Sequence, residues 1–210
     1  DGLRNRIRRL LAGLAESWIG INNALFSLYR KTTWDIELPD TLDHRGTYLV
    51  SSNHQSWVDI LVLQRALNRH IPFMRFFIKS QLFWVPFLGV AWWALDMPFM
   101  RRDSKEKLAK NPALRGRDLE NARKACEKFR GMPVSIMNFP EGTRFTPGKR
   151  DRNKVPYRNL LIPRIGGIGQ VFYALSEDLD ALVDVTIAYP QHGLDKPAPT
   201  FWDLLCGRIP

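Results

Sequence analysis

A histidine and an aspartate stand five residues apart in the stretch SSNHQSWVD, residues 51–59, directly after the apolar-leaning run TYLV. A turn followed by one turn of helix can fold the carboxylate of Asp59 back onto the imidazole of His54. A carboxylate in that position fixes one tautomer of the ring and leaves the other nitrogen free to accept a proton. The alternative is a core histidine beside a surface aspartate, since a lone histidine in a small domain is more often structural than catalytic.

Two side chains could act as covalent nucleophiles, and neither has the surroundings for it. Ser56 lacks the G-x-S-x-G setting of a nucleophile elbow. Cys126 falls on one face of a predicted helix, where packing alone explains a thiol. A base without a nucleophile of its own predicts that the substrate supplies the attacking hydroxyl.

A second polar motif, FPEGTR, occupies residues 139–144. Gly142 permits backbone amides to approach a ligand, and Arg144 can bind a phosphate with both arms of its guanidinium. The alternative is a plain turn with a surface ion pair. Taken alone, this motif is a weak indication of an anion site.

The elements around the two motifs predict that both lie at the carboxyl ends of strands. Residues 47–52 form a strand and residues 59–67 a helix, so His54 lies on a strand-to-helix turn. Further strands are predicted over residues 73–79, 134–139 and 181–189, and a helix over residues 118–129. Sites in open α/β sheets gather outside the carboxyl ends of the strands. We therefore predict a single α/β domain with a mixed, largely parallel sheet flanked by helices.

The first 28 residues predict an amphipathic helix with a basic start. Its apolar residues recur at three- and four-residue steps, at Leu3, Ile7, Leu10, Leu11, Leu14, Trp18, Ile21, Leu25 and Leu28, and Arg4, Arg6, Arg8 and Arg9 lie outside this stripe. An ordinary helix that covers a core and a helix that lies on a lipid surface share this pattern. The arginines favour the lipid surface.

A second apolar block covers residues 80–100, where Asp96 is the only charged residue. Its length suits a membrane span. Pro86, Gly89 and Pro98 interrupt a continuous helix, and a charge is costly in hydrocarbon. We expect short helices and a strand here, partly buried and partly set against lipid.

Composition limits the chain to one sizeable core and favours an anionic partner. The 210 residues are 45% hydrophobic, and the formal net charge is +10. Membranes and nucleic acids both fit such a charge, and the basic stretch RFTPGKRDRNKVPYR, part of which we expect to be a mobile loop, supports a non-catalytic nucleic-acid binder. No recognised nucleic-acid motif is present, so we expect no nucleic acid as a partner.

The two cysteines lack metal-type spacing and favour a reducing compartment. Because the chain begins at Asp1, we expect it to be part of a longer protein.

The two motifs, in this order and about eighty residues apart, resemble the first and third conserved blocks of the glycerolipid acyltransferase family typified by 1-acyl-glycerol-3-phosphate acyltransferase, the PlsC type. The resemblance runs from about residue 47 to the end. FFIKSQLFWVPFLG resembles the stretch between the first two blocks, and MPFMRR resembles the second block, although Asp96 stands where the family usually has glycine. LLIPRIGG matches the fourth block poorly. Together with the downstream segment VDVTIAYP, it is more similar to the subgroup of the family that includes lysocardiolipin and lysophosphatidylinositol acyltransferases.

The resemblance implies an O-acyltransferase, with residues 1–40 as a membrane-facing helical segment and 41–210 as the catalytic domain. It would move a fatty acyl group from acyl-CoA or acyl carrier protein to the hydroxyl of a lysophospholipid such as 1-acyl-glycerol-3-phosphate; glycerol 3-phosphate remains an alternative acceptor. His54 would be the general base and Asp59 its partner. The substrate-binding residues would be Lys79, Arg102, Glu141, Gly142, Thr143 and Arg144, with the arginines on phosphate and Glu141 orienting Arg144 or a substrate hydroxyl. We expect no metal or redox cofactor, an anionic membrane surface as partner, and a membrane-associated protein that faces the cytoplasm.

Overall fold

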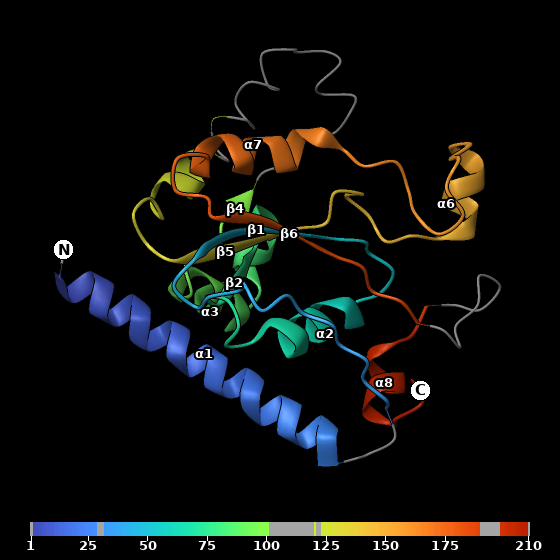
Figure 1. Ribbon diagram of the computed structural model, residues 1–210, viewed down its shortest axis with the longest axis horizontal. Helices are drawn as coiled ribbons and strands as arrows, with labels where there is room; N and C mark the ends of the chain where they lie inside the picture. Colours follow the sequence, from blue (N-terminus) through green and yellow to red (C-terminus); the bar gives the residue numbers. More distant parts are fainter. Residues whose placement is uncertain (1, 29–31, 101–119, 121–122, 190–197, 210) are drawn as a thin grey trace.

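The computed structural model describes residues 2–28, 32–100, 120, 123–189 and 198–209 (Figure 1). Its elements in chain order are α1 (Gly2–Leu28), β1 (Thr47–Ser52), α2 (Val58–Leu67), β2 (Met74–Phe76), β3 (Ile78–Lys79), the 3-10 helix η1 (Ser80–Trp84), α3 (Leu88–Ala94), β4 (Phe99–Met100), β5 (Val134–Asn138), α6 (Pro147–Arg152), α7 (Ile165–Leu175), β6 (Ala181–Val185) and α8 (Phe201–Leu205). The chain is also helical over residues 123–127.

A four-stranded sheet in the order β2-β5-β1-β6 forms the centre of the molecule. Every described pairing in it is parallel, so the predicted sheet is confirmed and the mixed pairing that we allowed for is not seen among these strands. Alternate residues of β1 face opposite layers: Leu49 packs with α7, and Val50 packs with α2 (Figure 1). Because the register pairs Ser51 with Asn138 and Ser52 with Val185, the neighbouring strands β5, β1 and β6 end together at one edge.

The single strand predicted over residues 73–79 is wrong. The chain breaks at Phe77 into β2, which joins the main sheet, and β3, which pairs with β4 in a separate two-stranded sheet. The strand predicted over residues 181–189 is shorter than expected and ends at Val185. The predicted helix over 118–129 is confirmed for residues 123–127, and its proposed start at residue 118 lies outside the described residues.

The basic stretch after the second motif contains a helix, contrary to the loop that we expected. Thr146 caps α6, its hydroxyl accepting a hydrogen bond from the backbone N–H of Lys149, and Pro147 occupies the first helical position, where its missing N–H costs nothing. Neither the cap nor the proline belongs to a hydrophobic pattern, so hydrophobic periodicity could not predict helix α6.

Helix α1 turns its apolar stripe away from the protein. Eight of the nine residues of the predicted stripe are between 47% and 76% exposed, the exception being Leu11. The opposite side contacts the body through Ala12, Ala15 and Ile19, which pack with Phe73 and Met97. The stripe therefore does not cover this protein's core. Arg8 also faces inward, with its Nε 2.8 Å from Oδ2 of Asp96, so it is not free to meet lipid as Arg4 and Arg6 are.

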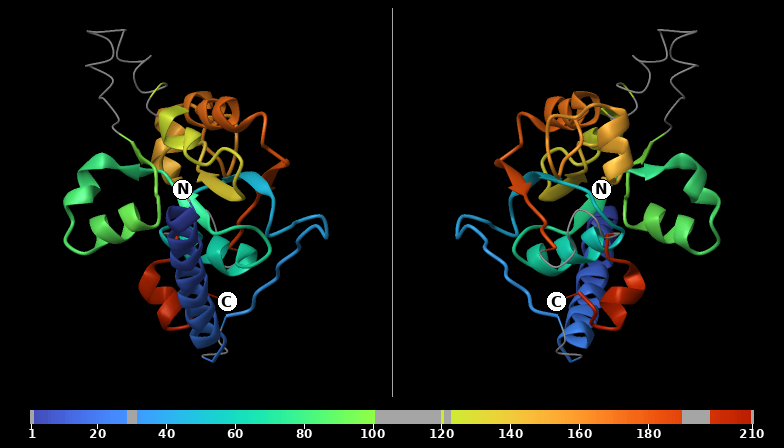
Figure 2. Two further views of the ribbon diagram at one scale, coloured as in Figure 1. Left: turned by 90° about the vertical axis from the view of Figure 1, so that its left-hand side faces the viewer. Right: turned by 90° about the vertical axis from the view of Figure 1, so that its right-hand side faces the viewer.

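The apolar block forms a small projection made of η1 and α3, which Figure 2 shows standing out from the body beside α1. Its short helices and the strand β4 confirm the predicted secondary structure, while the contact with lipid remains a prediction. Gly89 allows the two helices to pack closely, because a Cβ there would lie 1.7 Å from the carbonyl oxygen of Phe83. Trp84, Phe87 and Trp93 are 82%, 90% and 66% exposed. None of the helices in the described part of the chain has both the length and the apolar character that a bilayer crossing requires.

Candidate active site

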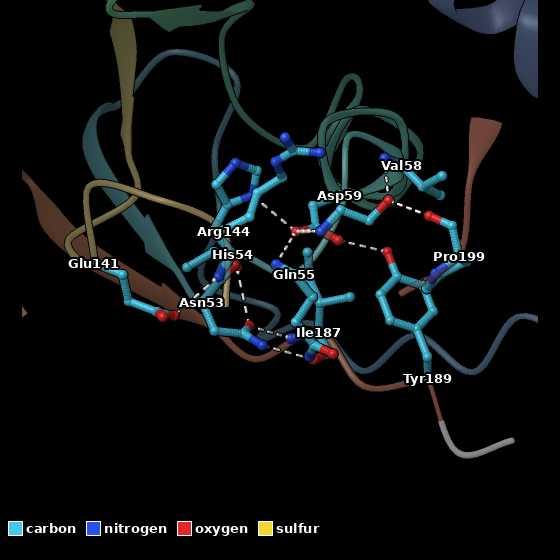
Figure 3. A network of polar contacts seen from close by, with 12 residues as sticks. Asn53, His54, Gln55, Val58, Asp59, Glu141, Arg144, Ile187, Tyr189 and Pro199 are labelled. Carbon is cyan, nitrogen blue, oxygen red and sulfur yellow. Dashed lines mark hydrogen bonds and ion pairs between the residues drawn. The ribbon is translucent and has the colours of Figure 1, made fainter. Parts of the chain in front are cut away.

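His54 and Asp59 meet at the carboxyl end of β1 (Figure 3). The chain leaves the strand at Ser52, turns, and enters α2 at Val58, which places Asp59 in the first helical turn. Nδ1 of His54 lies 2.9 Å from Oδ2 of Asp59. The fold therefore brings the two residues of the first motif into the predicted contact, and the surface-aspartate alternative is wrong, because Asp59 is fully buried.

The carboxylate of Asp59 is held by further donors besides the imidazole. Oδ2 accepts hydrogen bonds from the backbone N–H groups of Gln55 at 2.6 Å and Ser56 at 2.9 Å, and Oδ1 accepts one from the hydroxyl of Tyr189 at 2.6 Å. A buried carboxylate needs such donors to remain ionised. Burial, followed by the charge of Asp59, raises the pKa of Tyr189, so its hydroxyl keeps its proton and acts as a donor.

The His54 ring has one nitrogen left for chemistry. The ring stacks on Phe139, with 3.9 Å between centroids and 18° between planes, and the side chain is 14% exposed. Donation from Nδ1 to Asp59 leaves Nε2 with its lone pair, and Nε2 has no hydrogen-bond partner among the residues that the structure describes. This arrangement suits a general base.

Glu141 joins the second motif to the first. Its Oε1 accepts the backbone N–H of His54 at 3.1 Å, and its Oε2 accepts that of Leu161 at 3.0 Å. Glu141 is 4% exposed. Burial raises the pKa of its carboxyl, and the hydrogen bonds from the two backbone N–H groups lower this pKa and so offset part of the shift. Glu141 forms no ion pair with Arg144 within 4.0 Å among the described residues, so the expected contact between the two is not seen, and its proposed contact with a substrate hydroxyl remains a prediction.

The end of β1 is also bound to the chain beyond β6. The side chain of Asn53 donates to the carbonyl oxygen of Ile187 at 2.9 Å and accepts the Ile187 N–H at 2.8 Å. The side-chain amide of Gln55 donates to the same carbonyl at 3.0 Å. Sequence reasoning missed Asn53, Gln55 and Tyr189. The only signal available was that Tyr189 ends the predicted strand over residues 181–189, at the edge where sites gather.

The residues expected to bind substrate are placed in part. Gly142 adopts a left-handed conformation, φ 68°, within the turn after β5. Arg144 is exposed, with its guanidinium carbon 5.2 Å from the ring centroid of Trp57, and the next residue, Phe145, donates its N–H to the carbonyl oxygen of His54 at 2.7 Å. The hydroxyl of Thr143 accepts a hydrogen bond from Lys149 at 2.7 Å, a contact that stabilises the turn.

Two expected ligands are not placed by the structure. Arg102 lies outside the described residues, and for Lys79 the structure describes only the backbone, within β3. Their proposed roles remain predictions. In the described part of the chain, no three side chains of histidine, cysteine, aspartate or glutamate converge as a metal site would require.

A largely apolar groove of about 490 Å³, whose lining also contains Asp35, Glu37 and three threonines, reaches the site on the α2 side at Tyr189, the partner of Asp59. It reaches from Tyr189 and Val58 along α2, where Val62 and Ala66 line it, to the segment over residues 32–38. An apolar wall of this kind offers a hydrocarbon chain a place out of water.

The chain is similar to known acyltransferases in sequence. The family model described as Acyltransferase matches residues 34–189. The chain is 26% identical over 188 residues to 1-acyl-sn-glycerol-3-phosphate acyltransferase epsilon of Mus musculus, covering 81% of this chain and 49% of that protein. It is 27% identical over 216 residues to the probable 1-acyl-sn-glycerol-3-phosphate acyltransferase 5 of Arabidopsis thaliana, covering 97% and 53%.

Two further matches are more partial. The chain is 28% identical over 156 residues to lysocardiolipin acyltransferase 1 of Mus musculus, covering 68% of this chain and 39% of that protein. The crystal structure of the 1-acyl-sn-glycerophosphate acyltransferase PlsC from Thermotoga maritima matches with a TM-score of 0.39 and 20% identity, covering 69% of this chain and 46% of that one. The chain thus spans about half the length, or less, of the curated relatives that it matches.

Proposed function

The chain belongs to the acyltransferase family, and from that premise we propose that it transfers a fatty acyl group from an acyl thioester to the free hydroxyl of a lysophospholipid such as 1-acyl-glycerol-3-phosphate. The observation that carries the proposal is the His54–Asp59 pair, with Nδ1 committed to a buried carboxylate and Nε2 uncommitted. The names of the relatives support the class of acceptor.

In the proposed reaction, Nε2 of His54 removes the proton of the acceptor hydroxyl as its oxygen attacks the thioester carbonyl. Asp59 stabilises the imidazolium that forms. The tetrahedral intermediate then collapses, the carbon–sulfur bond breaks, and the thiolate takes the proton back from His54. General base catalysis of this kind contributes on the order of 10²–10⁴-fold. No covalent acyl-enzyme is needed, since the substrate supplies the nucleophile.

We assign the acceptor phosphate to Arg144. Its guanidinium is exposed, stacks near Trp57, and has no carboxylate within 4.0 Å among the described residues, so it is free to form a two-pronged contact with phosphate. Gly142 brings backbone amides to the same turn. Arg102 and Lys79 remain candidates for the same role.

We assign the acyl chain to the apolar groove that begins at Tyr189 and Val58. Because the groove ends at Tyr189, whose hydroxyl binds Asp59, a chain bound there would direct its thioester carbonyl toward the strand edge where His54 lies. Each buried CH₂ group adds about 0.8 kcal/mol to binding, so the groove favours long acyl donors.

We further propose that α1 and the η1–α3 projection dock onto one leaflet of an anionic membrane. The exposed stripe of α1 and the exposed Trp84, Phe87 and Trp93 supply the apolar contact. Helical spacing places Arg4 and Arg6 on the two flanks of the stripe, where their charges meet lipid headgroups. That this leaflet faces the cytoplasm remains a prediction.

The test of the activity is a transfer assay with labelled acyl-CoA and a panel of acceptors that includes lysophospholipids and glycerol 3-phosphate. His54→Ala should abolish transfer while the protein stays folded by circular dichroism. His70→Ala, which removes an exposed histidine at the other end of α2, is the matched control and should keep full activity. If folded His54→Ala keeps a tenth of the wild-type turnover, the base has been misassigned.

Docking is tested by flotation with vesicles of neutral lipid containing a fixed fraction of anionic lipid. Replacing Trp84 and Phe87 with serine should reduce the bound fraction, because their apolar surface no longer enters the interface. Replacing Phe172 and Tyr173, exposed aromatic residues of α7, removes comparable side chains from another element and should leave binding unchanged. Equal losses in the two double variants would contradict docking through the projection.

A further inference from the structure

A second cavity, of about 560 Å³, lies between α1 and the body of the protein. It is lined by residues that come just before three strands: Arg45 before β1, Phe73 before β2 and Pro133 before β5. These are the amino ends of the strands, whereas His54 follows the carboxyl end of β1. A six-residue strand rises by about 20 Å, so the cavity is too far from His54 to hold the reacting groups. Figure 1 shows the N-terminal half of α1 on the side of the molecule away from α6.

The cavity is strongly basic. Four arginines line it, Arg8, Arg9, Arg45 and Arg75, and Glu16 is the only acidic lining residue among those that the structure describes. Oε1 of Glu16 lies 2.9 Å from Nε2 of His44, so this carboxylate is already engaged. Arg8 is neutralised by Asp96 at 2.8 Å. The guanidinium groups of the other three, Arg9, Arg45 and Arg75, have no carboxylate within 4.0 Å among the described residues.

Arg75 is the unusual member of the group, because it is 5% exposed and forms no ion pair within 4.0 Å among the described residues, although the charges of Asp96 and Glu16 act on it from farther away. Its Nε donates to the carbonyl oxygen of Leu95 at 3.2 Å and one terminal nitrogen donates to that of Phe73 at 3.4 Å, while its guanidinium carbon lies 5.0 Å from the ring centroid of Phe129. Burial lowers the pKa of Arg75 to about 10, which still leaves it charged at neutral pH. Asp96 and Glu16 are already paired with Arg8 and His44, so an anionic ligand in the cavity would offset the cost of burying the charge of Arg75.

We propose that this cavity binds the phosphate group of a phosphoester anion, with Arg9, Arg45 and Arg75 as its ligands. Arginine suits phosphate because its planar guanidinium can donate two parallel hydrogen bonds. The remaining wall includes Ala12, Phe73 and Pro133, so the organic part of the ligand meets apolar surface. The inference does not depend on the proposed transfer reaction. The phosphate can belong to a phospholipid beside α1 or to a soluble phosphate monoester.

The test uses Arg9→Ala/Arg45→Ala, since both side chains are exposed and their removal leaves the core intact. Arg152→Ala/Arg158→Ala removes the same charge from exposed positions outside α1 that do not line the cavity, and is the matched control. All variants are made in an Arg144→Ala background, so that phosphate binding near His54 does not mask the result. Inorganic phosphate and glycerol 3-phosphate are titrated calorimetrically at constant ionic strength, and vesicles of phosphatidylcholine with and without phosphatidic acid are tested by co-sedimentation.

We expect Arg9→Ala/Arg45→Ala to weaken phosphate binding at least about tenfold, because charge-assisted contacts are lost, while the control changes it by less than about twofold. Weaker binding of the soluble ions supports a site open to free phosphate monoesters. Weaker binding confined to phosphatidic acid supports the headgroup of a membrane lipid. If the cavity variant loses no more affinity than the control for either probe, the proposal is wrong.

Discussion

Replacing Asp59 with asparagine separates the charge of the carboxylate from its shape. Oδ2 accepts three hydrogen bonds, two of them from the backbone N–H groups of Gln55 and Ser56, whereas Oδ1 accepts one from the hydroxyl of Tyr189. An asparagine amide therefore has one favourable orientation. Its oxygen takes the Oδ2 position, and its NH₂ group donates to the oxygen of Tyr189, whose hydroxyl hydrogen can rotate away. His54 then keeps an acceptor at Nδ1 and with it the productive tautomer.

The expected loss of rate is about tenfold. A hydrogen bond to a charged group contributes about 1.5–3 kcal/mol, and a neutral one about 0.5–1.5 kcal/mol. The difference, roughly 1–1.5 kcal/mol, applies to the imidazolium that forms when His54 takes the proton, and about 1.4 kcal/mol is a factor of ten. An amide in the opposite orientation would enforce the wrong tautomer, which costs on the order of 10⁴ in kcat.

The assay is kcat for acyl transfer at saturating donor and acceptor, with urea unfolding to establish that the variant is folded. Asp59→Ala is the companion variant: it removes the acceptor from several buried donors and should lower the free energy of unfolding by about 1–3 kcal/mol. A folded Asp59→Asn protein that loses on the order of 10³ or more in kcat would refute the argument that the backbone donors orient the amide.

Three further changes test other parts of the structure. Glu141→Gln should lower the free energy of unfolding by about 1–3 kcal/mol in urea titrations, because its NH₂ group must face one of two backbone N–H donors. Asp96→Asn keeps a side chain that tolerates the left-handed backbone, φ 57°, but removes the counter-charge of Arg8; we expect a loss of about 1–3 kcal/mol and faster proteolysis of α1. Burial raises the pKa of the Cys126 thiol from 9.0 to about 12. The protonated thiol therefore contributes to the free energy of unfolding fully below pH 9, and this contribution is lost as pH rises toward 12. In Cys126→Ala, this part of the decline in the free energy of unfolding should be absent.

The strand-turn-helix around His54 could be predicted because each signal there is local. An apolar run ends at a polar turn, and Asp59 falls within one helical turn of the histidine, so short-range geometry decides the contact. The parallel order of the strands then placed the second motif at the same edge.

Long-range and tertiary features could not be predicted in the same way. Tyr189 reaches Asp59 across 130 residues, and nothing in either segment records the pairing. The stripe of α1 shows that the helix is amphipathic, but not that the small residues Ala12 and Ala15 would form its protein-facing side. The run over residues 73–79 suits a strand throughout, and only the presence of β4 explains why its last residues leave the main sheet.

The sequence separation of the contacts around His54 determines the order in which the parts of the active site can form. The bond to Asp59 spans five residues, and it can form as soon as α2 does. The bonds from Glu141 and Tyr189 span 87 and 130 residues, and closing such loops is slower. In a chain emerging from the ribosome, the histidine–aspartate contact can therefore form before the residues that complete the site have been made. A truncated chain that stops before residue 181 should retain both residues and still lack activity.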